Sequence, residues 1–148
     1  MLLCCSVVLT SACSSDTQRW RVMLTTTKSL NQDDSGAGLP VVVRLYQLKA
    51  PGRFQQAEFK ALWKNDRDVL DGDMLERKEL TVFPDAKSVV EIDLQKKNGA
   101  EYIGVMALFR KPDMESWKQV VRAESSWWNP FTPKIRMVLE HYRVKLDD

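Results

Sequence analysis

The segment LPVVVRLYQL, residues 39–48, constrains the fold of this chain more than any other part of the sequence. It is rich in β-branched and aromatic side chains, and it is bounded by Pro40 and by Pro51-Gly52, which is typical of a β-strand. Val41, Val43 and Leu45 lie on one side of this strand. The other side carries Val42, Arg44, Tyr46 and Leu48. Because both sides are largely apolar, we expect this strand to lie in a sheet that is covered on both faces.

The rest of the chain predicts an all-β domain with one inserted helix. The apolar spacing becomes helical between residues 54 and 64, and one or two further helical turns are expected from Asp66 to Leu75, with Asp66 as a cap. Apolar residues change side near Leu139, which a β-bulge would explain. Alternating runs predict strands at 19–27, 79–83, 88–94, 101–110, 117–123 and 134–146.

Seven to eight strands at this short spacing predict an antiparallel β-sandwich. Its expected core contains Trp20, Val22, Val43, Leu45, Ile92, Val105 and Phe109.

The first thirteen residues, MLLCCSVVLTSAC, contain no charged side chain and are too short to span a membrane. They resemble the apolar and cleavage regions of a secretory signal. Thr10-Ser11-Ala12-Cys13 is similar to a bacterial lipobox, in which the cysteine is acylated and becomes the new N-terminus. The alternatives are an ordinary cleaved signal or a buried N-terminal strand. The predicted organisation is a lipoprotein signal peptide at 1–12, an acylated Cys13 with a tether at 13–18, and the sandwich at 19–148.

The composition argues against several classes of function. Twenty-two Lys and Arg against 20 Asp and Glu give a net charge of +2, which is too balanced for a nucleic-acid-binding protein. His141 is the only histidine, and cleavage before Cys13 would leave a single cysteine. No metal-ligand set can be built from these two residues. Residues 31–36 imitate the start of a calcium loop, but Val42 stands where the bidentate carboxylate would be required. We therefore predict neither an enzyme nor a cofactor.

Two segments are candidates for binding a partner. The connection from Lys28 to Gly38 has eleven residues and a polar composition, and long connections of this kind are either functional or disordered. An idle, solvated loop is the alternative. The second segment contains Trp127, Trp128 and Phe131, whose rings could form a binding patch or simply close one end of the sandwich.

Four segments stand out together: the lipobox-like leader, RWRVMLTTT at 19–27, VRLYQL at 43–48 followed by FKALW at 59–63, and EYIGVMALFRKPDMESWK at 101–118. Together they resemble the TssJ family, the outer-membrane lipoproteins of the type VI secretion system. The resemblance covers most of the chain after the leader and is weakest from Ser125 onwards.

The resemblance implies a transthyretin-like β-sandwich, tethered to the outer membrane and facing the periplasm. It implies binding to the periplasmic C-terminal region of the inner-membrane protein TssM, with no catalysis and no cofactor. In this family the loop between the first two strands is implicated in that binding. The residues expected to bind TssM are Leu30, Asn31, Gln32, Asp33, Asp34, Ser35, Gly36, Ala37 and Gly38, with Asp33 and Asp34 steering a basic patch of the partner.

The main alternative is a periplasmic carrier lipoprotein that binds a small ligand between its sheets. The sequence shows no set of polar groups that would converge on an apolar pocket, which argues against a carrier. A sandwich filled by side chains would favour the scaffold, and a cavity between the sheets would favour the carrier.

Overall fold

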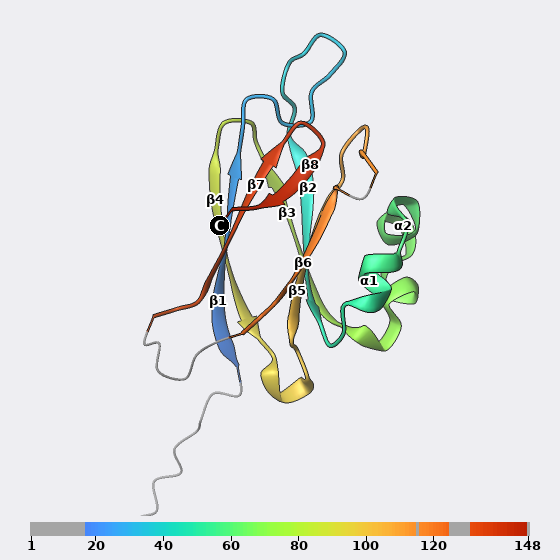
Figure 1. Cartoon of the computed structure of the whole chain (residues 1–148), viewed down its shortest axis with the longest axis vertical. Coiled ribbons are helices and arrows are strands. Elements are labelled where there is room, and N and C mark those ends of the chain that lie inside the picture. Colours follow the sequence, from blue (N-terminus) through green and yellow to red (C-terminus); the bar gives the residue numbers. More distant parts are fainter. Residues whose placement is uncertain (1–16, 115, 125–130, 148) are drawn as a thin grey trace, which may run out of the picture.

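A computed structural model describes residues 17–114, 116–124 and 131–147, which form two four-stranded sheets packed face to face (Figure 1). One sheet has the strand order β4-β1-β7-β8 and the other β3-β2-β5-β6. The strands are β1 (Gln18–Thr26), β2 (Val41–Leu48), β3 (Met74–Val82), β4 (Lys87–Leu94), β5 (Tyr102–Ala107), β6 (Lys118–Arg122), β7 (Lys134–Glu140) and β8 (Arg143–Leu146). The predicted β-sandwich with an inserted helical segment is confirmed.

The core residues expected from the sequence are all buried, with at most 4% of each side chain exposed. One pairing is parallel, since β1 runs beside β7 in the same direction, with Val22 opposite Ile135 and Leu24 opposite Met137. The sequence pattern does not carry this information, because side chains alternate in the same way in parallel and antiparallel strands.

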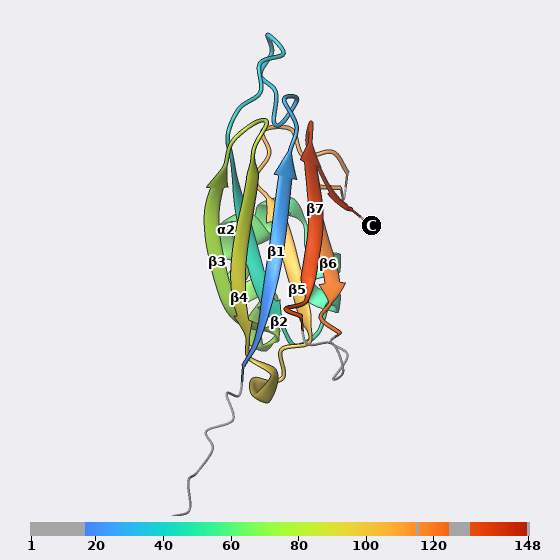
Figure 2. The same cartoon turned by 90° about the vertical axis from the view of Figure 1, so that its left-hand side faces the viewer.

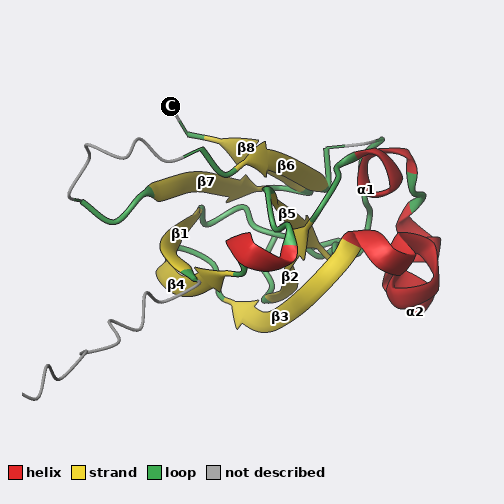
Figure 3. Ribbon diagram, turned by 90° about the horizontal axis from the view of Figure 1, so that it is seen from below, coloured by secondary structure: helices red, strands yellow, loops and turns green. Residues whose placement is uncertain are grey.

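β2 lies between β3 and β5 and is buried on both faces, as its composition predicts. Val43 and Leu45 face the other sheet, toward which Gln47 also points, since its side-chain amide donates to the carbonyl of Asp93 in β4 at 3.1 Å. On the outer face, Tyr46 and Leu48 are fully buried. Two helices, α1 (Gly52–Gln56) and α2 (Phe59–Leu70), cover that outer side (Figure 3).

The helical insert differs in detail from the prediction. α2 kinks at Asn65, where the backbone has φ −137° and ψ 39°, and continues to Leu70. Short 3-10 turns occur at Asp71–Asp73 (η1) and Lys96–Asn98 (η2), and β3 starts at Met74, so the helical turns expected up to Leu75 end earlier. Asp66 was expected to cap a helix, but its carboxylate instead accepts hydrogen bonds from Tyr46 and Arg77.

The C-terminal segment forms a hairpin rather than one bulged strand. β7 ends at Glu140 and pairs there with Arg143 of β8. His141 and Tyr142 make the turn, and His141 has a φ of 50°. The change of side near Leu139 therefore reflects two strands joined by a tight turn, and the predicted β-bulge is wrong.

Asp66 connects α2 to two strands of the sheet. Its Oδ2 accepts a hydrogen bond from the Tyr46 hydroxyl at 3.0 Å and one from the Arg77 guanidinium at 2.7 Å, and the Arg44 guanidinium lies 3.5 Å away. Burial by itself would raise the pKa of Asp66, but the hydrogen bonds from Arg77 and Tyr46 and the two positive charges outweigh it and lower the pKa. The ionised carboxylate therefore holds the helix on the sheet.

We expect Asp66→Asn to lower the free energy of unfolding by about 2 kcal/mol at neutral pH, because it removes the buried negative charge that accepts hydrogen bonds from Tyr46 and Arg77. Because the pKa of Asp66 is lowered in the folded protein, its contribution to the free energy of unfolding is complete above the ordinary pKa of an aspartate. That contribution is lost as the pH falls through the folded-state pKa. The difference between the two proteins should therefore shrink below about pH 4. Urea unfolding at several pH values measures it. Asp68→Asn, on the exposed side of the same helix, is the control and should behave as the wild type.

Candidate functional site

The connection between β1 and β2 projects from one end of the sandwich, and the chain enters β1 at the opposite end (Figures 1 and 2). β1 has nine residues, which span about 30 Å. The projecting loop is thus separated from the N-terminal end of the domain by the length of the sandwich. Three other connections reach the same end, namely those after β3, β5 and β7.

Asn31 fixes the base of this loop. Its backbone N–H donates to the carbonyl of His141 at 2.6 Å, and its side-chain amide donates to the carbonyl of Pro40 at 3.0 Å. Its Oδ1 accepts the backbone N–H of Arg110 at 2.9 Å. The side chain is only 4% exposed and the backbone has φ 47°, a conformation that asparagine tolerates better than most residues. One residue therefore joins three connections.

Neighbouring contacts complete the base. Leu30 is fully buried, and its carbonyl accepts the N–H of Leu39, which closes the loop at 2.9 Å. The carbonyl of Gln32 accepts the Tyr142 hydroxyl at 2.7 Å and the Arg110 guanidinium at 2.8 Å. A side chain at Gly38 would place its Cβ 2.3 Å from the carbonyl oxygen of Lys28, so only glycine fits there.

The tip of the loop is closed by Asp33. Its Oδ1 accepts the Ser35 hydroxyl at 2.7 Å and the N–H groups of Ser35 and Ala37 at 2.8 and 3.0 Å. These hydrogen bonds, the one from the Ser35 hydroxyl above all, lower the pKa of Asp33. Gly36 adopts φ 86° at the turn. The loop therefore has a defined shape, and Asp33 is engaged in forming it.

Asp34 is the exposed acid of the loop. Lys111 donates to its carboxylate at 3.0 Å and Arg110 lies 3.8 Å away, and both lower its pKa. Of the two carboxylates expected to steer a partner, Asp33 shapes the tip and Asp34 is the one presented to solvent. Arg110, Lys111 and Tyr142 were not predicted as part of the site, because they come from connections distant in sequence and only the fold brings them to the loop.

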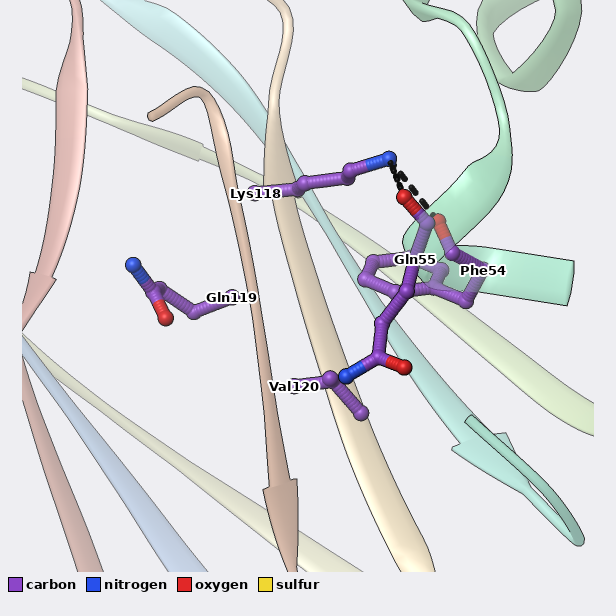
Figure 4. A pocket seen from close by; sticks show the side chains of 5 residues that line it. All are labelled: Phe54, Gln55, Lys118, Gln119 and Val120. Carbon is purple, nitrogen blue, oxygen red and sulfur yellow. Dashed lines mark hydrogen bonds between the residues drawn. The ribbon is translucent and has the colours of Figure 1, made fainter. Parts of the chain in front are cut away.

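A second feature is a pocket of about 430 Å³ beside α1, lined by Phe54, Gln55, Lys118, Gln119 and Val120 (Figure 4). Lys118 is buried, and its ammonium donates to the carbonyls of Phe54, Gln55 and Ala57 at 3.0, 2.7 and 2.6 Å. It also lies 4.6 Å from the centre of the Trp117 ring. These contacts tie α1 to β6, so Lys118 supports the helical insert.

The remaining predicted residues lie outside the described part of the chain. They are the acylation site Cys13, its tether up to Asp16, and the Trp127-Trp128 pair. Phe131, from the same segment as the two tryptophans, is described and is 75% exposed. Residues 17–114, 116–124 and 131–147 contain no cluster of metal-ligating side chains and no helix long and apolar enough to cross a membrane.

Comparison with known families decides the classification. A family model described as type VI secretion lipoprotein, with the member names VasD, EvfM and TssJ, matches residues 18–147. The chain belongs to this family. The TssJ resemblance predicted from the sequence is thereby confirmed, and the family is described as lipoproteins of type VI secretion.

Solved structures of the type VI secretion system share the fold of this TssJ-family chain. The lipoprotein TssJ1 from Pseudomonas aeruginosa is 25% identical, with a TM-score of 0.77 over 88% of this chain and 95% of that one. A chain of a type VI membrane complex is 27% identical, with a TM-score of 0.78 over 88% and 98%. A chain from a structure described as the T6SS protein TssM C-terminal domain from EAEC is 26% identical, with a TM-score of 0.76 over 88% and 98%. A comparison with curated protein sequences finds no significant match.

Proposed function

We propose that this TssJ-family chain is the outer-membrane lipoprotein of a type VI secretion membrane complex, and that it binds the periplasmic C-terminal region of TssM through residues 30–38. The observation that carries this proposal is the shaped loop between β1 and β2, which projects from the end of the domain opposite the start of β1. A tether at one end leaves the other end free to meet a partner from the inner membrane.

The geometry of the loop suits recognition. Asn31 and Asp33 hold the backbone in one conformation before a partner arrives. A pre-organised loop loses little conformational entropy on binding, so more of its contact energy appears as affinity. Asp34, at the exposed tip, would accept a basic group of TssM, which would compete with Lys111 for the Asp34 carboxylate.

The comparisons support TssM as the partner. Two chains that this one resembles come from structures described as a type VI membrane complex and as the TssM C-terminal domain. Each is covered over 98% of its length, so the likeness extends over the whole domain.

The carrier alternative finds less support. The interior between the sheets is filled by side chains such as Val22, Leu24, Val43, Leu45 and Val105, each at most 2% exposed. The pockets beside α1 and beside α2 each take part of their lining from a helix, Phe54 and Gln55 in one and Phe59, Lys60 and Trp63 in the other. A filled interior favours a scaffold over a carrier that holds a ligand between its sheets.

The loop tip gives the direct test. Replacing residues 33–37 by a short Gly-Ser linker keeps Leu30, Asn31 and Gly38, and it should change the free energy of unfolding by no more than about 1 kcal/mol, since closure entropy varies slowly with length. Affinity for the TssM C-terminal region should fall at least tenfold, about 1.4 kcal/mol. Thermal melts and calorimetric titration of the same purified variant measure both.

Arg122→Ala, at the opposite end of the sandwich, is the matched control and should bind TssM as the wild type does. Normal folding of the loop variant together with unchanged affinity would show that the interface lies elsewhere.

The membrane anchor is a separate proposal. We infer that Cys13 is acylated and that residues 13–18 tether the domain to the outer membrane. Each buried methylene contributes about 0.8 kcal/mol, so several acyl chains give effectively permanent attachment. Full-length protein should incorporate a labelled fatty acid and fractionate with the outer membrane, whereas Cys13→Ser should do neither. Labelling that persists in Cys13→Ser would place the modification at another residue.

A further inference from the structure

A second surface lies beside the loop, in an open groove of about 370 Å³ between α2 and the segment that follows β5. Figure 1 shows this segment, in orange, next to α2 at the end of the sandwich that carries the projecting loop. The lining residues are Phe59, Lys60 and Trp63 from α2, and Leu108, Phe109, Arg110 and Pro112 from the segment.

The floor of the groove is apolar and partly aromatic. The rings of Phe59 and Trp63 lie 6.2 Å apart, and Phe59 packs edge-on against Trp117 at 5.1 Å. Trp63 is nevertheless 46% exposed. Large aromatic side chains held half-open in a concavity are the usual anchors of protein interfaces, because a partner's side chain can cover them and exclude water.

The rim of the groove is positively charged. Lys60 and Arg110 belong to the lining, and the ammonium of Lys64 lies 5.7 Å from the centre of the Trp63 ring. The lining contains no carboxylate. An apolar floor with a cationic rim complements a segment that carries an aromatic or branched aliphatic side chain next to an acidic residue.

Arg110 makes the groove continuous with the loop. Its backbone N–H donates to Asn31, and its guanidinium donates to the carbonyl of Gln32. The same residue lines the groove. A chain bound against the loop could therefore continue into the groove without leaving the surface.

We propose that this groove is a second contact surface for the partner that binds the loop, and that it takes an apolar side chain flanked by an acidic residue from a protein segment. The inference rests on the proposed function, since the partner is the TssM C-terminal region. The size of the groove, at the lower limit of small-molecule sites, suits one or two side chains.

Two substitutions test the proposal by calorimetric titration with the TssM C-terminal region. Trp63→Ala removes the exposed anchor, and Lys60→Glu reverses the charge of an exposed side chain. Each should weaken binding at least tenfold, whereas Lys60→Arg should keep the affinity. Val89→Ala is the matched control, because Val89 is 57% exposed but lies on the other sheet. Thermal melts should show all four variants folded.

The outcomes separate the two proposals. If the wild type binds TssM and the loop variant binds weakly, but Trp63→Ala and Lys60→Glu bind as the wild type, the groove proposal is overturned and the proposed function stands. If the wild type does not bind TssM, both are overturned. If Trp63→Ala fails to fold, Lys60→Glu decides alone. If the wild-type domain self-associates and Trp63→Ala abolishes that self-association, the groove binds a second copy of the chain and the proposal is overturned.

Discussion

The three hydrogen bonds of Asn31 are the constraint on which the loop-bearing end of this domain depends. They connect the β1–β2 loop to Pro40, to Arg110 after β5 and to His141 between β7 and β8. All three partners are backbone groups. The arrangement therefore depends on the small amide side chain and the left-handed backbone of Asn31, and not on the side chains of the neighbouring residues. Because the base is fixed, the tip that Asp33 closes is held away from the sandwich in one orientation. A flexible loop of the same composition would lose more entropy on binding.

The second constraint is the burial of β2 on both faces. The side that carries Tyr46 and Leu48 cannot face water, so the chain covers it with the helical insert. Asp66 fastens that insert through Tyr46 and Arg77. The position of α2 in turn sets Trp63 against the segment after β5 and forms the groove. The loop and the groove thus share one end of the domain because the strand order brings their supporting segments together.

Much of the fold could be predicted from local patterns. The composition of residues 39–48 indicated a strand covered on both sides, and the change to a helical period located the insert. The parallel pairing of β1 with β7 and the turn at His141 could not be predicted, because alternation specifies neither the direction of a partner strand nor a tight turn without glycine. The same limit applies to the site. The polar loop was visible in the sequence, but its supports at Arg110 and Tyr142 depend on tertiary contacts.

The central claim is that Asn31 pre-organises the loop for its partner, and Asn31→Ala tests it most directly when hydrogen exchange and TssM affinity are measured on the same protein. We expect the amides of residues 33–39 to exchange at least tenfold faster, because the two side-chain hydrogen bonds to Pro40 and Arg110 at the base of the loop are lost, and the affinity to fall about tenfold. Asn98→Ala, an asparagine at the other end of the domain, should change neither. Faster exchange in the loop with unchanged affinity for TssM would contradict the account.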